Sequence, residues 1–434
     1  MMLASIALFA VTYVLLATEK LDKTAAALLG GCVAVMTGLV PHHEALAAID
    51  LNVVFLLMGM MIVVNILAGT GLFEWLAVTV ARKAKADGLR ILLLFVGATA
   101  LLSAFLDNVT TVILVAPITI LVCEILELKA APFLVLEAIA SNIGGTATLI
   151  GDPPNVLIAS ATGLTFNQFI VNLTPVVLVM LALLLPAVAL ALPHLAVVKP
   201  ENKARLLRAR PERTILQPVA LKRGLIVFAF IMVGFFASHA LHIEPGLIAL
   251  VGALVMAVAT GTNLHHALEK VEWTAIFFFV GLFMLIGAME HNGVFEALGH
   301  FILDLTKGNF TATVLVILWF AAIASSIVDN IPLVIAMIPL IRIIAPEFGE
   351  QMGLTDAAAI RAQVEEPLYW SLALGACLGG NGTIIGASAN VVVSQIAKRN
   401  RHPFTFMEWA RYGLPIMLGT VAISTVYLYL RYLR

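Results

Sequence analysis

Two short stretches of this sequence place polar and helix-breaking residues inside an otherwise apolar chain. The first reads SNIGGTATLIGDPPN over 141–155, and the second reads GGNGTIIGASAN over 379–390. Their Asn and Thr side chains offer hydrogen-bond donors and acceptors. Unwound main chain also frees carbonyls that can hold a cation, and N–H groups that can hold an anion or a ligand oxygen. The two stretches therefore predict a binding site.

A second kind of break carries an Asp-Asn pair, once in each half of the chain. Asp107-Asn108 precedes Val109-Thr110-Thr111, and Asp329-Asn330 precedes Ile331-Pro332. An Asp or Asn at such a point can cap the helix that follows. An ionisable side chain at membrane depth is also a functional candidate by default. Capping and ligand contact are compatible, and both interpretations stay open for these pairs.

Asp152 has no acidic counterpart in the second stretch, where Ala387 occupies the equivalent position. An acid present only once is not a requirement shared by both stretches. One interpretation is a proton carrier or a cation ligand. The other is a cap on a helix that begins at Pro153, because Pro is common at the first position of a helix.

The composition indicates a membrane protein with several spanning helices. Of 434 residues, 61% are hydrophobic and 12% are charged, and the mean hydropathy is +1.04. Soluble domains carry about 25% charged residues. Many runs approach the roughly 20 apolar residues that cross a bilayer. The cysteines fit no metal spacing, and we expect neither a cofactor nor a nucleic-acid partner.

The chain contains an internal repeat, which predicts two copies of one unit. An offset of 222 superimposes Gly59 on Gly281 and Asp107-Asn108 on Asp329-Asn330, and an offset of 235 superimposes GGTATLIG on GGNGTIIG. The first copy covers 1–195, with a re-entrant hairpin at about 91–126 and a broken helix at about 132–160. The second covers 224–434, with a hairpin at about 310–345 and a broken helix at about 367–397. A basic linker, 196–223, joins them.

Each copy is predicted to have five crossings and one hairpin, so the second copy must be inverted. With the linker in the cytoplasm, most of the 25 Lys and Arg residues fall at cytoplasmic ends. This predicts ten crossings with both termini outside. The linker residues in the count include Arg208 and Arg210, and the exceptions are Lys307, Arg342, Arg361, Arg431 and Arg434. Inverted repeats with broken helices are typical of secondary transporters, which bind their substrate near the midplane.

The Asp-Asn pairs together with GGTATLIGDPPN and GGNGTIIGASAN resemble the ion transporter superfamily, and within it the arsenite permease branch with its pink-eyed-dilution relatives. The resemblance covers nearly the whole chain. It implies an all-α fold of ten helices and two hairpins, divided into a scaffold domain and an elevator-type transport domain. By motif it also implies substrate or ion contacts from Asn108, Thr110, Asn142, Thr146, Thr148, Asn330, Asn381 and Thr383.

Other residues at the breaks are assigned supporting roles. The glycines are expected to permit close approach or unusual backbone angles; they are Gly144, Gly145, Gly379, Gly380 and Gly382. The coupling ion is assigned to Asp107, Asp152 or Asp329. Sodium-coupled carboxylate relatives carry Ser-Asn-Thr at both hairpin tips, whereas this chain has Asp-Asn-Val and Asp-Asn-Ile. No Lys or Arg is expected near the breaks, which favours a neutral hydroxylated substrate such as arsenious acid.

The sequence therefore predicts a secondary transporter that exports arsenite and antimonite from a bacterial cytoplasm, driven by inward proton movement. The main alternatives are a sodium/proton antiporter and a sodium-coupled importer of sulfate or carboxylates. A passive channel would not need the inverted repeat, and an intramembrane enzyme would need a motif such as H-E-x-x-H, which is missing from the sequence. We expect a multi-pass protein of the inner membrane, with a homodimer and a separate ATPase subunit as possible partners.

Overall fold

The computed structural model describes residues 1–18, 21–193, 198–207, 211–306 and 308–434, and within these ranges the regular structure is helical. Arg208, Arg210 and Lys307, which entered the predicted orientation, lie outside the described residues. Eight described helices are long and apolar enough to cross a membrane: α4, α7, α10, α12, α15, α17, α18 and α22. The predicted class, an all-helical polytopic membrane protein, is confirmed.

The first half of the chain contains the predicted hairpin and broken helix as pairs of separate helices. The hairpin is formed by α6 and α7, and the broken helix by α8 and α9. The helices are α1 (Met2–Thr18), α2 (Lys23–Met36), α3 (His42–Ala47), α4 (Leu51–Ala68), α5 (Leu72–Lys83), α6 (Gly88–Ser103), α7 (Asn108–Leu126), α8 (Ala131–Gly145), α9 (Pro153–Thr162) and α10 (Phe166–Ala191).

The second half repeats this order. Its hairpin is α17 with α18, and its broken helix is α20 with α21. The helices are α12 (Pro218–Leu241), α13 (Pro245–Thr260), α14 (Leu264–Glu269), α15 (Trp273–His291), α16 (Val294–Thr306), α17 (Phe310–Ile327), α18 (Asn330–Gln351), α19 (Ala357–Ile360), the π-helical turn η3 (Arg361–Glu365), α20 (Glu366–Gly379), the short turn η4 (Gly380–Gly382), α21 (Ser388–Arg399) and α22 (Phe406–Tyr432).

Two predicted boundaries differ from the ends of the helices in the structure. The linker predicted over 196–223 contains α11 (Pro200–Leu207) and the short turn η2 (Pro211–Arg213), and it ends where α12 begins at Pro218. Proline suits the first turn of a helix, where its missing N–H costs no hydrogen bond. The hairpin predicted to end near 345 instead continues to Gln351, because α18 runs through Pro346.

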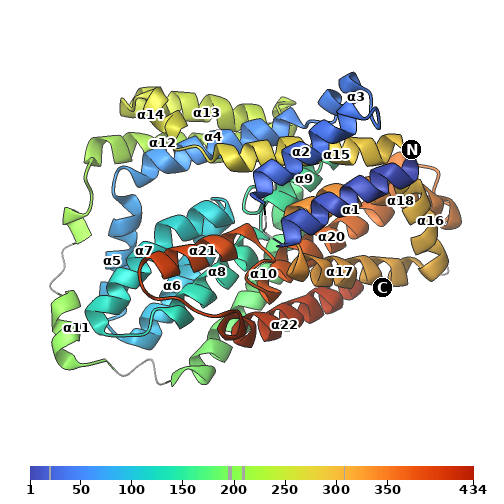
Figure 1. The fold of residues 1–434 in the computed structure, drawn as a ribbon. Helices are drawn as coiled ribbons and strands as arrows, with labels where there is room; N and C mark the ends of the chain where they lie inside the picture. The colour runs from blue at the N-terminus through green and yellow to red at the C-terminus, as the bar shows by residue number, and fades with distance from the viewer. Residues whose placement is uncertain (19–20, 194–197, 208–210, 307) are drawn as a thin grey trace.

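The helices form two layers (Figure 1). In one layer α2, α4, α13 and α15 lie together, with α4 packed on α13 and α2 packed on α15. In the other layer α6 packs on α8 and α17 packs on α20, so each hairpin lies against the broken helix of its own half. The helices α5 and α16 run between the layers at opposite ends of the molecule. We call the first group the frame helices, and we call the helices of both hairpins and both broken helices the core helices.

The contacts between the frame helices recur at the offset found in the sequence. A side-chain carbon at Gly59 would lie 2.5 Å from the carbonyl carbon of Ala249, and one at Gly281 would lie 2.5 Å from that of Ala27. Both members of one contact differ from their counterparts by 222 positions. Two copies of one packing unit would produce this recurrence. Their opposite orientation in the bilayer stays a prediction.

Two of the predicted crossings are short. The helix α2 has 14 residues and α13 has 16. At 1.5 Å per residue they extend roughly 21 and 24 Å, less than the roughly 30 Å of a typical hydrocarbon core. The helix α2 ends at Met36. These frame helices therefore reach across a bilayer only together with the turns that flank them.

Two exceptions to the positive-inside pattern have a local structural use. Arg342 donates a hydrogen bond to the carbonyl of Ala161, and Arg361 donates one to the carbonyl of Thr162 at 3.0 Å. Both carbonyls belong to the last turn of α9 and lack helical partners. A cation at a helix C-terminus is favourable because of the helix dipole.

Replacing Gly59 by Ala is expected to force α4 and α13 apart, because the added carbon overlaps main chain. Overpacking of this kind costs about 1–3 kcal/mol. Gly419→Ala is the matched control, since nothing lies within 4 Å of a carbon placed there. Thermal unfolding in detergent should show a lower midpoint for Gly59→Ala and an unchanged or higher one for Gly419→Ala. Equal midpoints would mean that the crossing is not closely packed.

Candidate functional site

The two hairpin tips are fixed by aspartates that cap the outgoing helices. Asp107 accepts a hydrogen bond from the main-chain N–H of Thr110 at 2.8 Å and a second from the Thr110 hydroxyl. Asp329 accepts from the N–H of Ile331 at 3.3 Å. The capping interpretation therefore describes both aspartates. Thr110, predicted as a substrate residue, uses its hydroxyl on Asp107.

The asparagines beside these caps point away from their own helices and toward Asp152. The Nδ2 atoms of Asn108 and Asn330 lie 3.1 and 3.4 Å from Asp152 Oδ1. All three side chains are at most 3% exposed. One carboxylate oxygen thus connects the tips of two hairpins whose asparagines are 222 positions apart.

Asp152 does not cap α9 with its side chain, although it precedes the first turn of that helix. Of the two interpretations of this residue, the structure therefore disfavours the cap. Its main-chain carbonyl accepts from the N–H of Asn155 at 3.0 Å, as at any helix start. Its carboxylate faces the Asn108 and Asn330 amides and the Cys377 thiol instead. The carboxylate lies where the two hairpins and the first broken helix meet.

A chain of amides continues from Asp152 into the second broken helix. Asn108 also donates to Asn142 Oδ1 at 3.1 Å. Asn142 then donates to Asn381 Oδ1 at 2.9 Å and to Asn390 Oδ1 at 3.0 Å. Predicted site residues from both halves of the chain are therefore in direct contact, in a fully buried network.

The main chain at each break is satisfied by one asparagine. The Nδ2 atom of Asn155 lies 3.2 Å from the Thr146 carbonyl and 2.8 Å from the Thr148 carbonyl. Asn390 lies 2.7 Å from the Gly380 carbonyl and 2.9 Å from the Thr383 carbonyl. Buried carbonyls need such partners. These two asparagines are not among the residues predicted to bind substrate, although the 235 offset relates them.

The threonines predicted to line the site at the breaks donate their hydroxyl hydrogen bonds to main-chain carbonyls. Thr146 donates to the carbonyl of Asn142 in its own helix at 2.8 Å. Thr148 donates to the carbonyl of Ala104, and Thr383 donates to that of Ser326 at 2.6 Å. In this conformation each hydroxyl offers a ligand only its oxygen.

The predicted hinge glycines are positions of close main-chain approach. A side-chain carbon at Gly144 would lie 2.0 Å from the Ala100 carbonyl oxygen, and one at Gly379 would lie 2.3 Å from that of Ala322. Neither residue has a positive φ. The same holds for Gly145, Gly380 and Gly382, each with an atom within 3 Å of the position of an added carbon.

Three buried polar atoms in this network have no hydrogen-bond partner among the described residues. They are Oδ1 of Asn108, Oδ2 of Asp152 and Nδ2 of Asn381. Buried polar atoms without partners are costly and rare in native proteins. A carboxylate oxygen and an amide oxygen suit a cation or a proton, and an amide N–H suits a hydroxyl or oxyanion. The network therefore presents unsatisfied donor and acceptor atoms that a bound ligand could satisfy.

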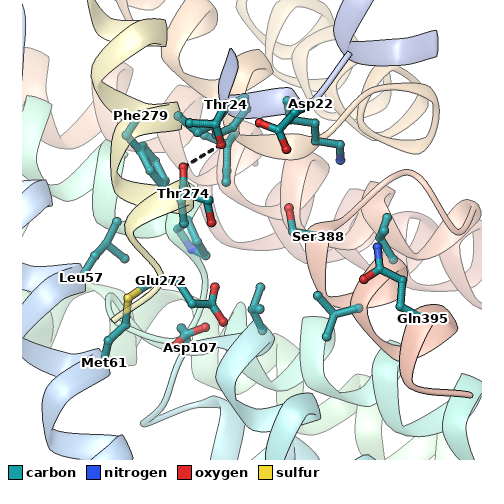
Figure 2. Close-up of a pocket in the computed structure, with 18 of the residues that line it drawn as sticks. Asp22, Thr24, Leu57, Met61, Asp107, Glu272, Thr274, Phe279, Ser388 and Gln395 are labelled. Atoms are coloured by element: carbon teal, nitrogen blue, oxygen red, sulfur yellow. Dashed lines mark hydrogen bonds between the residues drawn. The ribbon is translucent and has the colours of Figure 1, made fainter. Parts of the chain in front are cut away.

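A cavity of about 490 Å³ reaches the first hairpin tip from between the two layers. Asp107 lies on its core-helix side, and Glu272 at the start of α15 lies on its frame side (Figure 2). Asp22 and Lys23, which start α2, also line it. Three carboxylates and one ammonium group give this cavity an acidic lining.

The expectation that no Lys or Arg lies near the breaks is wrong, because Lys23 lies beside a hairpin tip. Its Nζ atom lies 3.4 Å from Asp329 Oδ2, at the second hairpin tip. Ser388 donates to the same carboxylate oxygen at 2.7 Å. The pair joins residues 306 positions apart, and no local pattern in the sequence indicates it. Tertiary packing brings Lys23 there, because α2 packs on α15 and α15 packs on α18 of the second hairpin.

Comparisons with known proteins identify several relatives. A family model described as a citrate transporter matches residues 13–375. The chain is 41% identical to an uncharacterized transporter of Mycobacterium tuberculosis and 39% identical to a 46 kDa membrane protein of Mycobacterium leprae, covering 100% of this chain and 99% of each relative. It is also 31% identical to the P protein of Homo sapiens, over 97% of this chain and 59% of that longer protein.

Asn390→Ala is expected to destabilise the second break, because two buried carbonyls lose their shared donor. An unsatisfied buried group costs about 1–3 kcal/mol. Asn400→Ala is the matched control, since its amide also donates to a carbonyl, that of Ile396 at 2.9 Å, but on the exposed surface. The unfolding midpoint in detergent should fall only for Asn390→Ala. A similar midpoint for both variants would mean that the break does not depend on this amide.

Proposed function

The chain belongs to the citrate transporter family of membrane transporters, and we propose that it is a secondary active transporter coupled through Asp152. Membership in this family, together with the similarity to the P protein, bears out the resemblance to the ion transporter superfamily. The observation that carries the proposal is the buried, incompletely bonded Asp152 carboxylate, held between two hairpin tips.

Alternating access is supported by the way the molecule is divided. The cavity separates frame helices from core helices, and it reaches one hairpin tip. Main-chain contacts recur at the repeat offset within both groups. In our proposal the two halves are inverted copies, and the core helices move past the frame. A homodimer would supply a stationary support for the frame.

Coupling through Asp152 rests on its environment and on its single occurrence. A bare carboxylate inside a membrane is unfavourable unless a cation or proton neutralises it. Asp152 Oδ1 accepts amide N–H groups, while Oδ2 lies buried without a partner. The equivalent position in the other half is Ala387, so one such carboxylate serves both tips. We propose that a proton binds Oδ2 and moves inward during each cycle.

For the transported solute we propose arsenious acid, with antimonite as a second substrate, moving outward from a bacterial cytoplasm. The network offers a small neutral triol the Asn381 amide N–H group and the oxygens of Asn108 and Asp152. The described cation beside it, Lys23, is already paired with Asp329. A citrate trianion would meet the carboxylates of Asp107, Asp152 and Glu272 without a compensating charge. A separate ATPase subunit would be an accessory to this export.

A sodium/proton antiporter is the second candidate, and one observation favours it. The unpartnered Asn108 Oδ1 and Asp152 Oδ2 are both oxygens, the ligand type that hard cations prefer. Sodium would then compete with a proton for Asp152. A sodium-coupled importer of sulfate or carboxylates is disfavoured by the acidic lining of the cavity.

Uptake into everted membrane vesicles distinguishes these candidates. Arsenite, antimonite, sodium and citrate are supplied in turn, with and without an imposed pH gradient. We expect arsenite and antimonite to accumulate only when the interior is acidic. If sodium alone dissipates the gradient, the arsenite proposal fails and the antiporter stands. Sodium-dependent citrate accumulation would instead identify an importer.

Asp152→Asn should abolish gradient-driven uptake, because an amide cannot take up and release a proton at this position. Uptake should fall to the level of vesicles without the protein, while the elution profile in detergent stays unchanged. Glu127→Gln is the control; Glu127 is exposed at the end of α7, where a hydrogen bond from Lys199 holds its pKa below the usual value. Gradient-driven uptake by Asp152→Asn at the wild-type rate would remove Asp152 from the coupling.

A further inference from the structure

The cavity lies along the boundary that must move in alternating access. One wall comes from the frame, including Leu57 and Met61 of α4 and Phe279 of α15 (Figure 2). The opposite wall comes from the core helices, including Ser388 and Gln395 of α21. A polar bond that crosses this boundary exists in one access state and must break before the other forms.

The ion pair between Lys23 and Asp329 is such a bond. Lys23 starts α2, which packs on α15 in the frame, and Asp329 caps α18 at a hairpin tip. The Asp329 side chain is 5% exposed and that of Lys23 is 26% exposed. The pair therefore lies at the inner edge of the cavity, where water and ions can approach the lysine.

The other hairpin tip has no equivalent pair at the corresponding positions. The offset of 222 relates Asp329 to Asp107 and Lys23 to Pro245, which has no charge. Asp107 bonds instead to Thr110 of its own helix. Lys23 is thus not part of the packing that the two halves share, and it serves one tip only.

We propose that Lys23 is an internal counter-ion, which displaces the coupling cation from Asp329 whenever the cavity is open. The proposal rests on alternating access as proposed above, and adds Asp329 as a second point of coupling. In the open state the ammonium group neutralises Asp329. When the hairpin tip leaves α2, the carboxylate loses this partner and binds a monovalent cation, a proton or sodium. Return to the open state restores Lys23 and releases that cation into the cavity.

This exchange gives the cation a direction. It is loaded where Lys23 is absent and released on the side to which the cavity opens, which the predicted topology places in the cytoplasm. Lysine suits the task because its ammonium group is a point charge on a flexible stem, whereas arginine holds a carboxylate through two bonds. Among the described residues, the other titratable groups near the pair are Asp22, Asp107, Asp152, Glu272 and Tyr13.

The test measures how often the cavity is open, without any substrate. Gln395→Cys, in a background with the exposed Cys32 changed to Ser, is labelled by a membrane-impermeant thiol reagent from the cavity side. Labelling is followed in reconstituted full-length protein in three media, which are alkaline and sodium-free, alkaline with sodium, and acidic and sodium-free. Each variant is compared with the unaltered Lys23–Asp329 pair in the same medium.

With the pair intact, sodium should slow labelling about five- to tenfold, within the range usual for coupled equilibria, because it binds Asp329 only in the state that Lys23 has left. Acid should do the same beyond its effect on the reactivity of the thiol itself, and the medium that slows labelling identifies the cation. Lys23→Gln should remove this effect, because a cation can then bind Asp329 in either state. Lys23→Arg should keep it.

The double variant Lys23→Gln with Asp329→Asn separates charge compensation from packing. Without the Asp329 carboxylate this exchange cannot occur, so any cation dependence left in the double variant is due to Asp152 and serves as the baseline. A cation dependence of the intact pair that does not exceed this baseline, or one of Lys23→Gln that does, would overturn the proposal. Arsenite is absent throughout, so failure of arsenite transport would leave the result for Lys23 intact.

Discussion

Main chain that leaves helical geometry in the middle of a membrane must find hydrogen-bond partners within the protein, and the rest of this structure depends on how that is done. The side-chain amides of Asn155 and Asn390 each donate to main-chain carbonyls of the break that precedes them. Each break is thereby held in one conformation. The remaining polar side chains, among them Asn108 and Asn142, are then free to meet one another and a ligand.

The two halves share their scaffold but differ in their chemistry. Ser103 donates to the Ser141 carbonyl, and at the offset positions Ser325 donates to that of Ala376. The side chains at the centre are not duplicated in this way. Asn142 has Cys377 as its counterpart at offset 235, and Cys377 lies 3.7 Å from Asn155 Oδ1. Duplicated contacts fix the geometry, whereas the differences, above all at Asp152, give the site its polarity.

Local patterns in the sequence predicted what depends on local residues. Glycine, proline and asparagine placed both breaks and both hairpin tips within a few residues, because these residue types act on their own stretch of main chain. The offsets also related the asparagines that satisfy the breaks. Cys377 could have been found opposite Asn142 by the same arithmetic. The hydroxyl of Thr148 could not be assigned, because its partner at Ala104 lies in another element.

Contacts between elements that are far apart in the sequence could not be predicted from local patterns. The approach of Lys23 to Asp329 depends on α15, which packs on both α2 and α18. The position of the Asp152 carboxylate depends on the two hairpin tips that lie beside it. The sequence left a cap as one of two interpretations of Asp152, and tertiary packing places its carboxylate beside the hairpin tips instead. Similarly, α18 continues through Pro346 because the helix is largely buried against its neighbours.

One physical constraint applies to the carboxylates at the centre: a side chain that moves through the membrane interior should carry little net charge. Asp329 has Lys23 beside it, whereas Asp152 is surrounded by amides and has no cation among the described side chains that bond to it. An element that carries Asp152 across the bilayer therefore moves at least cost with a proton or cation bound. In that picture coupling needs no dedicated gate. It results from the unfavourable transfer of an unpaired carboxylate through a medium of low dielectric constant.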